Sequence, residues 1–350
     1  MRNKQYKAII FAILAAVLYA ISSPVSKLLL KEIPPTMMAS FLYIGAGLGM
    51  SIVDLIKHKK YGEITEARLT KRELPYTIGM VVLDIIAPIF LMIGLTMTSA
   101  ANVSLLNNFE IVATSLIALS IFKEPISKRL WVAIFLITIS SIILSVEDIS
   151  SFSFSSGSIF VILACICWGL ENNCTRKLSV KDPLQVVIVK GFGSGIGSLL
   201  IALTLGEKTT NISYIIVALI LGFFAYGLSI FFYIYAQRDL GAAKTSAYYA
   251  ISPFIGVGLS LIIFREMPTS SFFIALFLMI IGMYFASTEV HNHMHHHIAI
   301  THEHSHSHND GHHNHIHNEN IIGKHTHIHT HEECTHSHKH NQDIHHSHAH

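Results

Sequence analysis

The sequence is poor in charge: only 13% of its 350 residues are Asp, Glu, Lys or Arg, against roughly 25% in soluble domains. The formal net charge is only +2, so the chain lacks the strong basic field of a nucleic-acid-binding protein. Three of its four cysteines, Cys165, Cys167 and Cys174, lie in one apolar segment, which excludes a disulfide scaffold. The first 290 residues contain a single histidine, His58. These absences argue against a soluble enzyme or a small secreted domain.

Apolar residues, by contrast, make up 51% of the chain, and the mean hydropathy is +0.50. A helix needs about 20 apolar residues to cross the hydrocarbon layer of a membrane. Ten segments qualify: 8–30, 36–56, 76–98, 101–122, 130–147, 157–178, 184–205, 213–235, 243–264 and 270–288. The sequence therefore predicts an all-α integral membrane protein with ten transmembrane helices, embedded in the lipid bilayer.

The basic residues outside the spans predict how these helices are oriented. Short cytoplasmic loops are enriched in Lys and Arg. If the N-terminus is cytoplasmic, the cytoplasmic segments collect 17 basic residues and the opposite loops collect four. We therefore expect a multi-pass protein of the plasma membrane (the inner membrane in a bacterium), with both termini in the cytoplasm.

The chain also contains an internal repeat. An offset of 149 residues aligns Tyr19-Ala20 with Trp168-Gly169 and Pro34 with Pro183. A second offset of 142 residues aligns Phe122-Lys123-Glu124 with Phe264-Arg265-Glu266. Each copy, 7–147 and 157–288, holds five spans, so the second copy must enter the membrane in the opposite direction. Inverted repeats of this kind build alternating-access transporters.

These features together resemble a known family. Trp168-Gly169 followed by Asn172 and Arg176, the two Phe-Lys/Arg-Glu signatures and the ten-span double repeat are similar to the EamA family of the drug/metabolite transporter superfamily. The resemblance covers about residues 7–288. It implies a central pathway lined by both halves and the movement of small organic solutes, such as amino acids or other metabolites, often as export. Family members often carry an arginine where this chain has Phe41 and Lys190.

The function expected from sequence is therefore secondary transport of a small-molecule substrate, with proton coupling as an option and with no cofactor required. The sequence shows no nucleophile–base constellation and no nucleotide-binding loop, so we do not expect an enzyme. The alternative is a transporter of transition metals such as Zn, Ni or Co, or one regulated by them. The sequence leaves a homodimer open.

Charged residues inside the spans are the first candidates for the substrate pathway or for ion coupling. A charge at bilayer depth costs several kcal/mol, roughly 2.5–3.5 on insertion scales, so it usually faces a cavity or a partner. Asp84 and Glu110 fall near the middle of their spans, and Glu171 and Lys190 lie within the sixth and seventh. The competing interpretation is that the carboxylates pair with Lys190 and only fix the packing.

Polar and aromatic residues near these charges complete the candidate pathway. They occur beside Glu110, in matching stripes of the first and sixth spans, and next to Pro253, which loosens a helical turn. The residues are Asn107, Asn108, Asn172, Trp168, Tyr19, Tyr248 and Ser252. Ordinary interhelical packing is the alternative for each of them.

The last 60 residues, 291–350, form a separate histidine-rich tail. They hold 24 of the 25 histidines and few apolar residues, which predicts disorder. Imidazole is a preferred ligand of zinc, nickel and copper, so we expect the tail to bind divalent transition-metal ions. The candidate ligands are His302, His304, His306, His308, His327, His329, His331, Cys334, His336 and His338.

Overall fold

The computed structural model describes residues 2–61, 67–122, 126–148, 153–178, 181–240, 245, 248–265, 268–287, 291–297, 300–306, 325–331 and 334–340. Helices dominate the part before the tail. They are α1 (Arg2–Ala20), α2 (Ser22–Leu29), α3 (Pro35–Tyr61), η1 (Lys71–Glu73), α4 (Leu74–Met97), α5 (Ala100–Leu106), α6 (Phe109–Phe122), α7 (Lys128–Ser145), α8 (Ser156–Leu178), α9 (Pro183–Thr204), α10 (Ile212–Gly222), the π-helix η2 (Phe223–Leu228), α11 (Ser229–Leu240), α13 (Ser252–Phe264) and α14 (Ser270–Ser287). A short hairpin, β1 (Val146–Asp148) with β2 (Ser153–Phe154), joins α7 to α8.

Eight helical stretches of the described chain are long and apolar enough to cross a membrane. Two further apolar stretches, Ser252–Phe264 and Ser270–Ala286, are shorter. The ninth predicted span, 243–264, is only partly described, and its helix α13 begins at Ser252. The all-helical, multi-pass membrane architecture is therefore established, and the count of ten crossings stays a prediction.

Several spans are interrupted rather than continuous. The fourth span breaks at Asn107 and Asn108, between α5 and α6, and the first breaks at Ile21 before Pro24. In the eighth span, six residues form the π-helix η2 between α10 and α11. Such wider turns occur frequently at functional sites.

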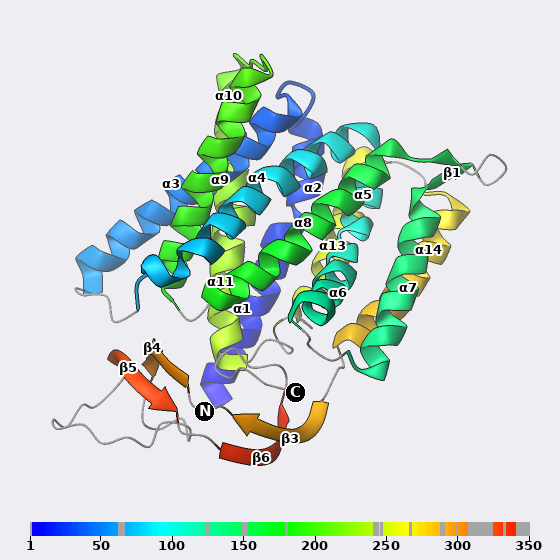
Figure 1. The fold of residues 1–350 in the computed structure, drawn as a ribbon. Helices are drawn as coiled ribbons and strands as arrows, with labels where there is room; N and C mark the ends of the chain where they lie inside the picture. Colours follow the sequence, from blue (N-terminus) through cyan, green and yellow to red (C-terminus); the bar gives the residue numbers. More distant parts are fainter. Residues whose placement is uncertain are drawn as a thin grey trace.

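Helices of the two halves pair in antiparallel fashion across the molecule. Ser40 of α3 donates a hydrogen bond to the carbonyl of Gly195 in α9 at 2.8 Å, and a Cβ placed on Gly191 would lie 2.5 Å from the backbone of Gly47. The same opposed direction relates α4 to α8, α1 to α11 and α7 to α14, as contacts between them such as Ser140 with Ala275 illustrate (Figure 1). Small residues permit these close approaches where no hydrophobic force drives helices together.

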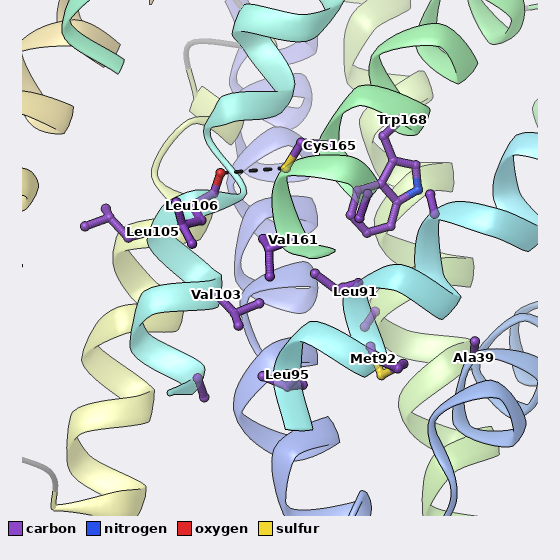
Figure 2. Close-up of a cluster of buried hydrophobic side chains, with 14 of the residues drawn as sticks. Ala39, Leu91, Met92, Leu95, Val103, Leu105, Leu106, Val161, Cys165 and Trp168 are labelled. Carbon is purple, nitrogen blue, oxygen red and sulfur yellow. Dashed lines mark hydrogen bonds between the residues drawn. The ribbon is translucent and has the colours of Figure 1, made fainter. Parts of the chain in front are cut away.

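Part of the large apolar core lies where α4, α5 and α8 meet. Figure 2 shows Leu91 and Leu95 of α4, Val103 of α5 and Val161 of α8 packed against one another. Cys165 of α8 makes a long hydrogen bond, 3.7 Å from Sγ to the carbonyl of Leu106 at the end of α5. This core fixes α8 against the first repeat, and α8 carries several of the candidate pathway residues.

Only parts of the tail are described, and the disorder expected for residues 291–350 stays a prediction. The described parts form two antiparallel pairs, β3 (His291–His297) with β6 (Cys334–His340) and β4 (Ile300–His306) with β5 (His325–His331). Along most of these strands His alternates with other residues, which is the two-residue period of a β-strand. In Figure 1 these strands lie at the end of the bundle where α1 begins.

Candidate functional site

Three charged side chains from three helices meet inside the bundle. The Lys190 ammonium on α9 lies 2.9 Å from Oδ2 of Asp84 on α4 and 3.0 Å from Oε1 of Glu171 on α8. Asp84 is fully buried, Glu171 is 2% exposed and Lys190 is 7% exposed. Asp84 belongs to the first repeat, while the other two residues belong to the second. We call these three residues the charged triad.

Two hydroxyl groups complete the triad. Tyr43 of α3 donates a hydrogen bond to Oδ1 of Asp84 at 2.9 Å, and Thr175 donates one to Oε1 of Glu171. With all three charged groups ionised, two carboxylates face one ammonium, so the triad carries one formal negative charge. Hydrogen bonds to ionised groups are stronger than neutral ones, and they offset part of the cost of burying that charge.

Glu110 forms a second polar centre, on the first turn of α6 directly after the helix break. Its Oε1 accepts a hydrogen bond from Nδ2 of Asn172 at 2.6 Å, and the same amide lies 3.3 Å from the hydroxyl of Thr114. Glu110 is half-buried and forms no ion pair among the described residues. A carboxylate held by an amide alone remains available to a proton or to a positively charged group of a substrate.

The two asparagines at the break have different roles. The Nδ2 of Asn108 donates to the carbonyl of Leu105, in the last turn of α5, at 3.2 Å. Asn107 is 8% exposed, and its Oδ1 has no hydrogen-bond partner among the described groups. The backbone carbonyl of Asn107 accepts from the amide of Glu110 at 3.1 Å, which begins α6 and places Glu110 on its first turn.

Tyrosine rings lie beside the charged triad. Tyr226, in the π-helix, accepts a hydrogen bond from Ser22 at 3.2 Å, and its ring centroid lies 5.2 Å from Tyr43 and 5.9 Å from Tyr19. Tyr19 in turn lies 6.0 Å from Tyr249. The rings connect α1, α3 and η2 to the chain just before α13. They give the interior an aromatic wall next to the charged triad.

The structure groups the charged residues expected from sequence into two centres: Asp84, Glu171 and Lys190 form the charged triad, and Glu110 pairs with Asn172. Trp168 is 6% exposed and packs in the apolar core, so it does not share the environment of Asn172, which contacts Glu110 (Figure 2). Tyr248 is half-buried, and the buried hydroxyl of Ser252 has no described partner.

The sequence did not predict two residues of the site, Tyr43 and Tyr226. Both are aromatic residues within apolar runs, where a lipid-facing or core position is the ordinary expectation. Only the spacing between Asp84 and Tyr226, which equals the 142-residue repeat offset, could have pointed to Tyr226.

The described side chains contain no group of three His, Cys, Asp or Glu residues arranged to hold a metal ion. Of the candidate metal ligands, His308 lies outside the described residues, and for the others only the backbone is described. The strand register sets His302 opposite His329 and His304 opposite His327. It also sets His336 and His338 opposite other histidines of β3.

A bundle of apolar membrane-length helices with buried charges supplied by two inverted halves has the architecture of a membrane transporter. The model of the EamA-like transporter family matches residues 6–146 and 155–288, so the chain belongs to this family and has its two-repeat organisation. The family and the two-repeat organisation expected from the sequence are thereby confirmed.

Known relatives carry the same general description. The chain is 28% identical over 271 residues to an uncharacterized transporter of Methanothermobacter thermautotrophicus, covering 73% of this chain and 78% of the relative. It is 26% identical over 174 residues to the uncharacterized transporter YyaM of Bacillus subtilis, covering 47% and 56%. A solved crystal structure covers 80% of this chain and 96% of its own, with a TM-score of 0.60 and 13% identity, which supports the fold alone.

Proposed function

We propose that the protein is a secondary transporter that moves small organic solutes, amino acids or other metabolites, out of the cytoplasm by alternating access. The observation that carries this proposal is the charged triad, because Asp84 comes from one repeat and Glu171 and Lys190 come from the other. Rocking of one half against the other would change the surroundings of this shared centre, as transport by inverted repeats requires.

We assign coupling to protons through Glu110. Its carboxylate has an amide partner, Asn172, but no ion pair among the described residues, so it can take up a proton without breaking a salt bridge. The excess of basic residues in alternate loops supports a plasma membrane orientation with both termini in the cytoplasm.

Proton-driven transport in liposomes tests this assignment. With the purified protein and a panel of amino acids, a pH gradient should drive solute movement, and Glu110→Gln should abolish that drive. The variant keeps a carbonyl acceptor for Asn172, so it should insert normally and retain exchange of solute across the membrane. Thr114→Ala, which removes only the hydroxyl beside Asn172, serves as the matched control. Undiminished coupling in Glu110→Gln would remove Glu110 from the mechanism.

Metal transport, or regulation of transport by a metal, is the second candidate. The cross-strand register of histidines in the tail favours it, since directly opposed residues in a strand pair share one face. A chain ending at residue 290 should then change the cellular content of zinc, nickel or cobalt. Unchanged content of all three metals would eliminate this candidate.

A further inference from the structure

The beginning of α3 has no capping side chain of its own. The helix begins at Pro35, and the residue before it is Pro34, which has no side-chain oxygen. The amides of Thr36 and Met37 instead donate to the two carboxylate oxygens of Glu207, at 3.4 and 2.8 Å. Glu207 belongs to the other repeat, so one half of the molecule caps a helix of the other.

The end of α9 holds Glu207 in place. Gly206 has a φ of 71°, a left-handed conformation that favours glycine. Its amide donates to the carbonyl of Leu203 at 3.1 Å, and the amide of Glu207 donates to the carbonyl of Ala202 at 3.0 Å. These are the bonds of a helix-terminating Schellman motif. The sharp turn at Gly206 therefore directs the carboxylate onto the start of α3.

A second contact of the same kind joins the loop after α3 to the start of α9. The amide of Leu69 donates to Oε1 of Gln185 at 2.8 Å, and the amide of Asp182 donates to the carbonyl of Ala67 at 2.8 Å. Lys181 adds an ion pair with Glu73 at 3.5 Å. Gln185 stands 149 residues after Thr36, which is the repeat offset. We name the two contacts the Glu207 clasp and the Gln185 clasp.

The two clasps lie at opposite ends of the bundle, because α3 and α9 cross in antiparallel fashion with Ser40 beside Gly195 and Gly47 beside Gly191. In each clasp, the loop after one of these helices holds the beginning of the other. The two clasps differ in one respect. When the Gln185 clasp opens, α9 keeps its own cap, Asp182, which accepts from the amide of Leu184 at 3.1 Å. When the Glu207 clasp opens, α3 loses the carboxylate that caps it.

We propose that Glu207 is a positioning residue of the transport cycle, which holds its end of the bundle closed. Both clasps are formed in this structure, and opening of either end of the bundle breaks one of them. The inference rests on the proposed alternating access. It follows from the geometry that an opening at the α3 end separates Glu207 from Thr36 and Met37. Weakening the Glu207 clasp therefore shifts the population towards the state open at that end, and weakening the Gln185 clasp does the reverse.

Labelling of introduced thiols by a membrane-impermeant maleimide tests this inference. The natural cysteines are replaced by alanine, and single reporters are introduced as Thr36→Cys and Ala67→Cys, at positions that are 2% and 4% exposed. Glu207→Ala should raise the labelling rate of the Thr36→Cys protein roughly fivefold, the shift expected from loss of a helix cap, and should lower that of the Ala67→Cys protein. Glu207→Gln keeps one acceptor oxygen and should have a smaller effect.

Two controls make the outcome decisive. Lys208→Ala changes the exposed neighbour of Glu207 and should leave both rates unchanged, whereas Gln185→Ala should shift both in the opposite sense. An increase confined to Thr36→Cys would mean local fraying of α3, and unchanged rates would mean no clasp; either result overturns the inference. Labelling needs no substrate, so failure of solute movement in liposomes would count against the proposed function alone.

Discussion

Two equivalent helix crossings in the molecule have very different chemistry. Where α4 meets α8, Asp84 and Glu171 are bridged by Lys190. Where the eighth span meets the first, Tyr226 and Ser22 share a neutral hydrogen bond of 3.2 Å. Tyr226 stands 142 residues after Asp84, and Glu171 stands 149 after Ser22, so the repeat relates the two crossings to each other. We call them the charged crossing and the neutral crossing.

The two halves share one backbone arrangement but carry different polar groups at equivalent crossings. The position equivalent to Lys190 in the first repeat is Phe41, so only the second repeat supplies the bridging cation. An unpaired buried charge is costly, so the charged residues must be gained or lost together. In the proposed transport pathway, the polar centre at one crossing and the aromatic residues at the other would form two different walls.

Removal of the bridging cation is expected to have the largest effect. Lys190→Met leaves Asp84 and Glu171 facing each other without a counter-ion, and breaking a buried ion pair in this way costs about 3–5 kcal/mol. The midpoint of unfolding of the detergent-solubilised protein should fall accordingly. Combining Lys190→Met with Asp84→Asn and Glu171→Gln should recover most of the loss, because no charge is then left unpaired. Wild-type stability of the single variant would show that the triad is hydrated rather than enclosed by protein.

The charged crossing was the part of the site that the sequence could predict. Asp84, Glu171 and Lys190 are conspicuous because charge is rare inside apolar spans, and the repeat followed from matched prolines and charges at span boundaries. Tyr226 and the π-helix around it were not predictable, because η2 lies within an uninterrupted apolar run. Glu207 was missed for the opposite reason: a polar residue in a loop is ordinary, and only the fold brings it to the start of α3.

An intermediate effect is expected for the hydroxyl that connects the aromatic wall to the triad. Tyr43→Phe removes the donor 2.9 Å from Asp84 and keeps the ring beside Tyr226. Hydrogen bonds to charged groups contribute about 1.5–3 kcal/mol, so the free energy of unfolding should fall by that amount. In an Asp84→Asn background the loss should shrink towards that of a neutral hydrogen bond. A loss of equal size in both backgrounds would indicate that Tyr43 acts through packing alone.

The smallest effect should come from the neutral crossing. Tyr226→Phe removes the acceptor of the Ser22 hydroxyl without changing the ring stacking, and a neutral hydrogen bond contributes only about 0.5–1.5 kcal/mol net. Ser22→Ala should cost a similar amount, and the double variant should cost little more than either single one, because both changes remove the same bond. The free energy of unfolding of the three variants, compared as a double-mutant cycle, measures this directly. If Tyr226→Phe lowers the free energy of unfolding as much as Tyr43→Phe does, Tyr226 must also interact with the charged crossing. The two crossings would then differ less in chemistry than their contacts indicate.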